Sequence, residues 1–175
     1  EFVQKRAPWQ SAVEGASIPI PFLTAHFCLE HLAKLRCGER VLIHAAAGGV
    51  GLAAVRLAQR VGAQVFATAG APWKRALLRS IGVEHVFDSR STEFAEQILA
   101  ATGGAGVDVV LNSLSGPQIE ASFRAIARGG RFVEIGKRDI KSHEWVSALE
   151  RRLQYDIVDW RSEEHTSELQ SLSSI

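Results

Sequence analysis

The chain has 175 residues, of which 46% are hydrophobic and 22% are charged, and its formal net charge is +1. This length and composition fit one globular domain with a sizeable core. The near-neutral charge gives no reason to expect nucleic acid or an anionic membrane as a partner, and we expect no apolar run long enough to span a bilayer.

The start of the sequence and its cysteines indicate where the protein works. The N-terminal residues EFVQKRAPWQ contain no apolar stretch like that of a signal peptide, and the missing initiator Met suggests a fragment. Cys28 and Cys37 form no C-x-x-C pair, and His26 and His31 flank Cys28 at spacings that match no familiar zinc motif. We therefore expect a cytoplasmic protein with structural cysteines and no metal site.

Residues 1–38 are predicted to form an N-terminal segment and a linking helix. Pro19 and Pro21 argue for an irregular, extended chain over residues 1–20. Apolar residues then recur at helical spacing, which predicts a helix over Phe22–Leu35, and Gly38 ends it.

A strand, turn, helix and strand are predicted between Arg40 and Ala69, which is the length of a βαβ unit. The apolar strands lie at residues 41–43 and 65–67. The turn matches G-x-G-x-x-G with alanine in its first position, and its residues are Ala46, Ala47, Gly48, Gly49, Val50 and Gly51. Gly48 would let backbone N–H groups reach a pyrophosphate, and Gly51 would let the helix lie close to the sheet. A tight turn that serves packing alone is the alternative.

The end of the second strand indicates which dinucleotide would bind. An NAD site usually has Asp or Glu there, whereas this chain has Thr68 and no acid, followed by Lys74 and Arg75 at the start of the next helix. A hydroxyl and two cations suit a 2′-phosphate, which a carboxylate would repel. The sequence therefore favours NADPH, with ordinary solvated helix charges as the alternative for Lys74 and Arg75.

The remaining sequence repeats the alternation of helix and strand. Helices are predicted over residues 73–81, from Ser91 or Thr92 to about Ala101, and over residues 118–127. Strands are predicted over residues 83–87, 107–111 and 131–135. Repeated βα units with apolar strands predict an α/β fold, namely a doubly wound parallel sheet of the Rossmann type over residues 39–160.

Ligands in such sheets bind beyond the carboxyl ends of the strands, which selects a short set of candidate residues. These are Ala45–Gly51, Thr68–Ala71, Ser89, Arg90, Asn112–Ser115 and Ile135–Lys137, a range that includes Gly136. Asn112 and Ser113 could bond to ribose or to the carboxamide, and Lys137 could face the nicotinamide. For each residue alone, a loop cap or a solvated charge is an equal alternative.

The last residues do not fit the rest of the chain. The run RSEEHTSELQS, residues 161–171, is similar to the in-frame translation of a widely used sequencing-library adapter. We therefore interpret residues 161–175 as a non-native tail and leave them out of the fold prediction.

Several blocks of the sequence resemble the enoyl reductase domain of modular polyketide synthases, a zinc-free member of the medium-chain dehydrogenase/reductase superfamily. The resemblance extends from Ser17 to Trp160 and rests on IPIPFLTAH, GERVLIHAAAGGVGLAAVRLAQ, VFATAG, KRALLRSIGV, DSRS, ATGGAGVDVVLNSLSG and GGRFVEIGKRDI. LNSLSG and GKRDI are more specific than the glycine-rich turn. The animal fatty acid synthase reductase is a close relative.

The resemblance implies NADPH-dependent reduction of a trans-2-enoyl thioester carried on an acyl carrier protein. Hydride would reach the β-carbon, and a proton would then reach the α-carbon. The resemblance also implies that other megasynthase domains are partners and that the parent protein is a homodimer. The substrate-side domain of such reductases lies largely before the point where this chain begins.

The same resemblance implies roles for individual residues. Residues 45–51 would hold the pyrophosphate, and the remaining cofactor contacts would come from Thr68, Lys74, Arg90, Asn112 and Ser113. Lys137 matches the lysine of the family's GK-x-D-I stretch, a candidate proton donor or oxyanion stabiliser. Asp159, in YDIVDW, is the candidate partner of that lysine, with a solvated strand-end carboxylate as the alternative.

Two other interpretations of the function remain open. One is a zinc-free quinone or enoyl-CoA reductase of the same superfamily, which would act on free substrates; NSLSG and GKRDI argue against it. The other is a cofactor-binding module without turnover, either because the domain is degenerate or because the chain is truncated.

Overall fold

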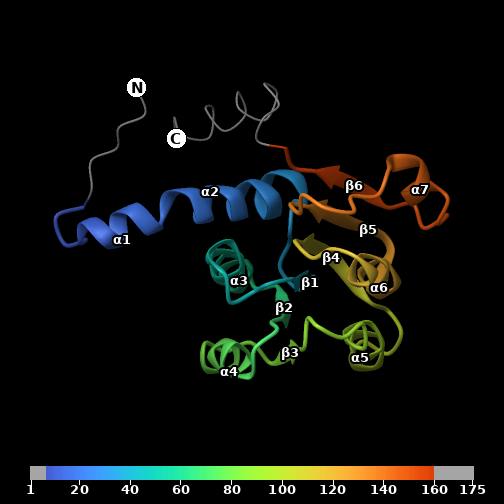
Figure 1. Ribbon diagram of the computed structural model, residues 1–175, viewed down its shortest axis with the longest axis horizontal. Helices are drawn as coiled ribbons and strands as arrows, with labels where there is room; N and C mark the ends of the chain where they lie inside the picture. Colours follow the sequence, from blue (N-terminus) through green and yellow to red (C-terminus); the bar gives the residue numbers. More distant parts are fainter. Residues whose placement is uncertain (1–6, 160–175) are drawn as a thin grey trace.

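The computed structural model describes residues 7–159, and within them the chain forms one six-stranded sheet (Figure 1). The strands are β1 (Arg40–Ile43), β2 (Gln64–Thr68), β3 (His85–Phe87), β4 (Val107–Asn112), β5 (Ile126–Glu134) and β6 (Gln154–Ile157). Their order is β3-β2-β1-β4-β5-β6, and every neighbouring pair is parallel. The predicted doubly wound parallel sheet is therefore confirmed. The tail at residues 161–175 lies outside the described residues.

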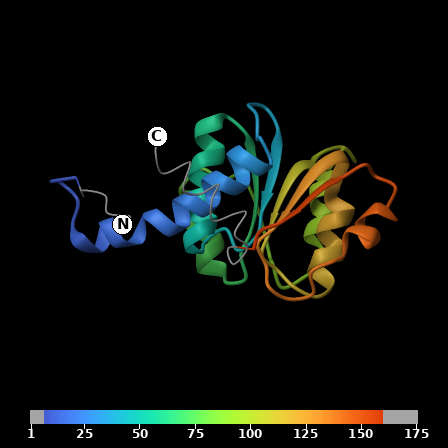
Figure 2. The ribbon, with the colours of Figure 1, turned by 90° about the horizontal axis from the view of Figure 1, so that it is seen from above.

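Helices cover both faces of this sheet (Figures 1 and 2). One face carries α3 (Gly49–Val61) and α4 (Pro72–Ser80), together with helices that precede β1. The other face carries α5 (Phe94–Ala101), α6 (Pro117–Ala125) and α7 (His143–Ser147). The sheet thus separates two hydrophobic cores, as a doubly wound fold requires.

The central strands explain why apolar runs predicted this fold. In β1, Val41 and Ile43 join the core beneath α3, whereas Leu42 joins the core beneath α6. All three side chains are fully buried. A strand covered on both faces needs apolar side chains at every position, so its sequence shows a continuous run instead of alternation.

The chain is helical from Ala12 onward, so the prediction of an irregular chain is wrong over residues 12–20; residues 1–6 lie outside the described residues. Helices α1 (Ala12–Ser17), α2 (Pro19–His26) and the π-helix η1 (Phe27–Leu32) follow one another. Ser11 and Glu14 form a capping box that starts α1. Pro19 and Pro21 lie in the first turn of α2, where a missing N–H removes no intrahelical hydrogen bond. The prolines therefore begin a helix instead of preventing one.

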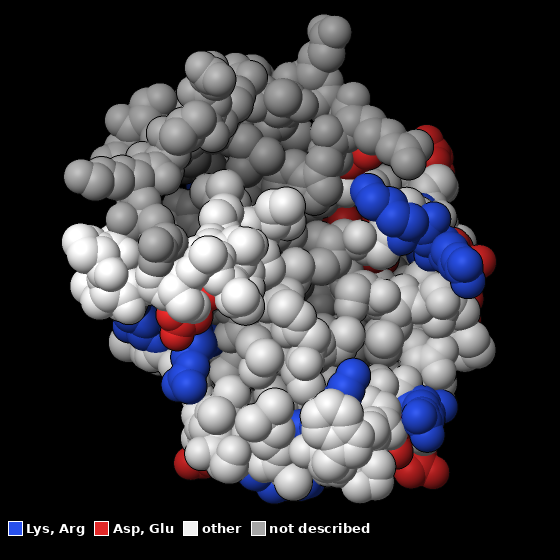
Figure 3. Space-filling view, turned by 60° about the vertical axis from the view of Figure 1, so that its left-hand side comes forward, with Lys and Arg blue, Asp and Glu red and all other residues white. Residues whose placement is uncertain are grey.

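The segment Ala12–Leu32 corrects the expectation that no stretch could span a bilayer. It has 21 residues, and an 18-residue window within it has a mean hydropathy of 1.2, so by length and composition it qualifies as one candidate span within residues 7–159. Val13 and Ile20 are exposed on it, and the described surface in Figure 3 is largely uncharged. Core helices of soluble proteins and signal sequences can have the same length and hydropathy. The inner part of this segment, at Ala25 and Phe27–Leu29, is buried in the core beside α3.

Strand β5 also differs from its prediction, because it begins at Ile126 and not at Arg131. Gly129 and Gly130, which come just after the helix predicted over residues 118–127, lie inside the strand. Gly129 has a φ of +76°, and the ladder between β4 and β5 shifts register between Val107 and Val109. The glycines therefore mark a bulge within the strand, a role that glycine often has in sheets.

Candidate cofactor site

The crevice of the doubly wound sheet lies between β1 and β4. The helix that follows β1 covers one face, and the helix that follows β4 covers the other, so the chain diverges at the carboxyl ends of this strand pair. Val41, Leu42 and Ile43 pair with Val109, Val110 and Leu111. In open α/β sheets this position is where ligands bind. The glycine-rich turn and the Asn112–Ser115 segment lie at its two sides.

The start of α3 offers backbone N–H groups at this crevice. The N-cap residue, Gly48, is extended, and no side chain caps the helix. Leu52 N donates to Gly48 O at 2.8 Å and so begins the helical ladder. The first N–H groups of a helix have no partner within it and attract anions, an effect that the helix dipole strengthens. The 13-residue helix α3 can therefore receive a pyrophosphate here.

Gly51 is required at its position by close approach of the backbone. A Cβ atom there would contact Ala45 O and would lie 2.6 Å from Ala46 Cα and 2.8 Å from Ala46 C. These neighbours are backbone atoms that no rotamer change can move. Gly51 thus lets α3 start directly against the end of β1, which agrees with the packing role predicted for it.

A buried histidine that the sequence prediction missed lies beneath the turn. His44 Nε2 lies 2.8 Å from Ser122 Oγ, and His44 Nδ1 lies 2.8 Å from Thr68 Oγ1. Because Ser122 Oγ donates its one proton to Gln118 O, it accepts from His44 Nε2–H. The Nδ1 atom therefore accepts from the Thr68 hydroxyl. Burial lowers the pKa of His44 from 6.5 to about 3, so the imidazole is neutral.

This contact places the Thr68 side chain differently from the prediction. Thr68 is fully buried, and its hydroxyl faces His44 inside the protein. Its carbonyl oxygen accepts from Ala46 N at 3.0 Å and so ties the end of β2 to the glycine-rich turn. Thr68 therefore supports the site through its backbone, and its hydroxyl is not directed toward a phosphate.

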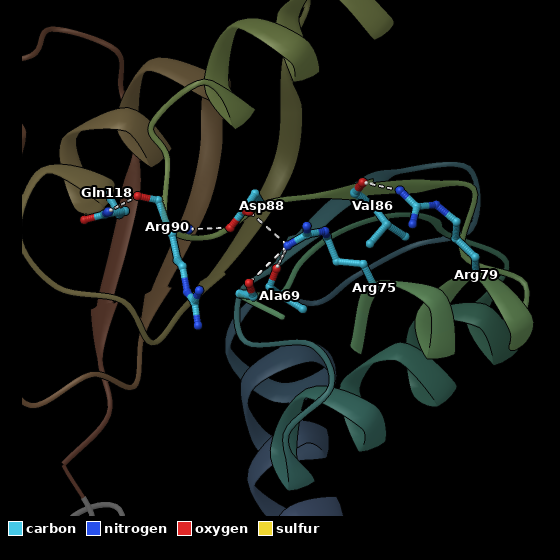
Figure 4. Close-up of polar contacts among 8 residues, drawn as sticks. Ala69, Arg75, Arg79, Val86, Asp88, Arg90 and Gln118 are labelled. Atoms are coloured by element: carbon cyan, nitrogen blue, oxygen red, sulfur yellow. Dashed lines mark hydrogen bonds and ion pairs between the residues drawn. The ribbon is translucent and has the colours of Figure 1, made fainter. Parts of the chain in front are cut away.

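Charged residues surround the end of β2 (Figure 4). Arg75 forms an ion pair with Asp88, with 3.0 Å between Nη1 and Oδ2. Lys74 is half-buried, and its Nζ lies 5.4 Å from the centre of the exposed Trp73 ring. Arg90 is exposed and follows β3. The three predicted cations thus lie near the end of β2. The carboxylate of Asp88, which the sequence did not predict as a site residue, lies there too.

Asn112 is bound within the protein and not directed at a ligand. Its Nδ2 donates to Glu134 Oε2 at 2.6 Å and to Leu114 O at 3.1 Å, and its Oδ1 accepts from Leu114 N at 3.2 Å. Glu134 is fully buried, and its Oε1 accepts from Gly136 N at 2.6 Å. Burial raises the pKa of Glu134, while these two hydrogen bonds oppose that shift. Asn112 and Glu134 therefore fix the loops after β4 and β5.

Ser113 is the residue of this loop that suits a ligand. Its Oγ is buried, and among residues 7–159 no hydrogen-bond partner reaches it. A buried hydroxyl without a partner is costly, and a ligand group can satisfy it. Together with the uncapped start of α3, this atom fits a dinucleotide lying across the crevice.

The predicted pair of Lys137 and Asp159 is brought together after β5 and β6. Lys137 Nζ donates to Val158 O at 3.1 Å and lies 3.7 Å from Asp159 Oδ1. The side chains are 60% and 54% exposed, so water screens their attraction. Within the described range, His, Cys, Asp and Glu residues form no group of three or more that could hold a metal ion.

Comparison with known proteins identifies the family. Residues 49–155 match the family described as Zinc-binding dehydrogenase. The nucleotide-binding subdomain of the enoylreductase domain of PpsC from Mycobacterium tuberculosis is 41% identical, with a TM-score of 0.79 and 89% of each chain covered. The JamJ enoyl reductase is 47% identical, with a TM-score of 0.89, over 95% of this chain and 50% of that chain. This chain belongs to the enoyl reductase domains of polyketide synthases.

The enoyl reductase domain described here is only a small part of its curated relatives. A highly reducing polyketide synthase, apmlA, of Arthrinium phaeospermum is 49% identical over 154 residues, which are 81% of this chain and 6% of that protein. The site and the matched nucleotide-binding subdomain imply a nicotinamide cofactor for this enoyl reductase domain.

Proposed function

We propose that this chain is the NADPH-binding part of an enoyl reductase that acts on trans-2-enoyl thioesters carried on an acyl carrier protein. The observation that carries the proposal is the uncapped, glycine-lined start of α3 at the β1/β4 crevice. A helix start of this kind binds the pyrophosphate, and Ser113 Oγ is free to meet the ribose or nicotinamide side.

The choice of NADPH rests on the charges near the end of β2. The residue after Thr68 is Ala69, so β2 itself ends without the carboxylate that binds the ribose hydroxyls in an NAD site, and the nearby Asp88 is paired with Arg75. Lys74 and Arg90 supply positive charge for a 2′-phosphate. This charge pattern supports NADPH over NADH.

Calorimetric binding of NADPH and NADH to this chain tests the cofactor assignment. We expect NADPH to bind at least about tenfold more tightly, a difference of about 1.4 kcal/mol, and Lys74→Ala to reduce that preference. Lys34→Ala is the matched control, because Lys34 is exposed and lies beside Arg131, away from the carboxyl ends of the strands. Equal binding of the two cofactors by the folded protein contradicts the assignment.

Bound NADPH would supply a hydride to the β-carbon of the enoyl group, and the α-carbon then requires a proton. Lys137 is held by Val158 O beside Asp159, close to the loops that end β5 and β6. Its ammonium group can donate the proton or stabilise negative charge on the thioester oxygen. Asp159 lies beside this ammonium group and can help to orient it.

Substitution of Lys137 tests this role. In a polypeptide that carries this chain together with a substrate-side domain, we expect Lys137→Ala to lower kcat by about a hundredfold with an unchanged Kd for NADPH. NADPH oxidation with crotonyl-pantetheine is the measurement, and Arg138→Ala, on the exposed neighbouring residue, is the control. Turnover with quinones alone would favour a quinone reductase. Tight NADPH binding without any turnover would favour a binding module.

A further inference from the structure

Arg75 is positioned to hold the polypeptide around the end of β2 (Figure 4). Its Nη1 atom donates to Ala69 O at 3.0 Å and to Gly70 O at 3.1 Å. The same atom lies 3.0 Å from Asp88 Oδ2, and the side chain is only 19% exposed. A cation near the N-terminus of α4 is opposed by the helix dipole, so its place is explained by these contacts and not by helix stability.

Asp88 extends the same connection to the turn after β3. Its Oδ1 accepts from Arg90 N at 2.9 Å while its Oδ2 faces Arg75. The Arg90 side chain in turn lies across Gly70, since a Cβ atom at Gly70 would be 3.2 Å from Arg90 Nε. The Arg75–Asp88 ion pair therefore joins two segments, Ala69–Gly70 and Asp88–Arg90, that follow the neighbouring strands β2 and β3.

We propose that Arg75 is a positioning residue, which shapes the adenosine-phosphate pocket through Asp88 and does not itself bind the 2′-phosphate. The Nη1 atom of Arg75 contacts two carbonyl oxygens and a carboxylate within the protein. Arg90, in contrast, is exposed. The ion pair also cancels the negative charge of Asp88, which would otherwise repel a phosphate. The inference rests on the proposed function and revises the direct contact that the sequence predicted for Arg75.

The double variant Arg75→Gln/Asp88→Asn tests the proposal, because it removes both charges and leaves the net charge unchanged. Kd values for NADPH and NADH are measured by calorimetry on the whole chain. If Arg75 positions the pocket, both cofactors bind about three- to tenfold more weakly, and their ratio is preserved. Lys74→Ala and Arg90→Ala, in contrast, weaken NADPH alone.

Two results would overturn the positioning role. Selective loss of NADPH affinity in the double variant would make Arg75 a direct phosphate ligand. Unchanged affinity for both cofactors would show that the Arg75–Asp88 ion pair does not shape the cofactor site. If the double variant does not fold, Arg75→Lys provides the same comparison, because it keeps the charge but its ammonium nitrogen does not reach as far as Arg75 Nη1. For Arg75→Lys we expect a smaller loss of affinity than for the double variant, and the loss should be equal for NADPH and NADH.

Arg79→Gln is the matched control. Arg79 lies on the same helix, and its Nη2 donates to Val86 O at 3.1 Å (Figure 4). Its loss is expected to affect stability and to leave both Kd values unchanged. Failure of the proposed function is distinguishable, because a wild-type chain without preference for NADPH contradicts the cofactor assignment, while the NADH values still test the positioning role.

Discussion

Gly51→Ala is expected to destabilise the protein by about 3 kcal/mol and to abolish cofactor binding. The added methyl group would meet backbone atoms of Ala45 and Ala46, 2.6 Å away at the nearest carbon. Helix α3 would have to move away from the end of β1, and the N–H groups at its start would move with it. Urea unfolding and NADPH calorimetry are the measurements.

Gly49→Ala is the matched control for this substitution. Gly49 lies in the same turn of α3, but a Cβ atom there would meet the Pro21 side chain, at 3.5 Å from Cγ and 3.9 Å from Cβ, which are ordinary contacts. Since alanine favours a helix over glycine by about 1 kcal/mol, the control should fold at least as well as the wild type. Equal stability of the two variants would show that close backbone approach does not constrain this turn.

A second large effect is expected from pH, through His44. Its pKa is about 3 in the folded protein and near 6.5 when unfolded, so between these values the unfolded chain binds one more proton. The free energy of unfolding should therefore fall as pH falls from about 6.5, by about 1.4 kcal/mol per unit, and the full contribution should be present above that pH. Urea unfolding across this range measures the slope.

Two variants separate the contribution of His44 to the pH dependence of stability from that of other titrating groups. His44→Gln should be less stable near neutral pH, because Thr68 and Ser122 lose well-placed partners, but its stability should depend less on pH. His143→Gln, at an exposed position, should keep the wild-type slope. An unchanged slope in His44→Gln would mean that other groups cause the acid sensitivity.

The polar residues of the site show the limit of prediction from sequence. Apolar runs identified the strands because burial on both faces imposes a pattern that a single sequence displays. Thr68 and Asn112 were correctly located at strand ends, but their side chains are bound by His44 and Glu134 from neighbouring strands. Whether a strand-end side chain meets a ligand or its neighbour depends on partners that are distant in sequence.

In the N-terminal region, two local features of the sequence favour opposite structures. Pro19 and Pro21 argue against a helix over residues 1–20, whereas Ser11 and Glu14 form a capping box that begins one. Lys137 and Asp159 were paired through the family resemblance alone, and the structure brings them to 3.7 Å. No spacing rule could have paired them, because each follows a different strand.

The strand order also determines when the crevice can form during synthesis. β1 pairs with β4 as well as with β2, and the chain between β1 and β4 contributes two other strands. A nascent chain that ends after β3 therefore carries β1 with one apolar edge unpaired, and such edges promote association with other chains. Polypeptides that end before Val107 should therefore aggregate more readily than polypeptides that include β4.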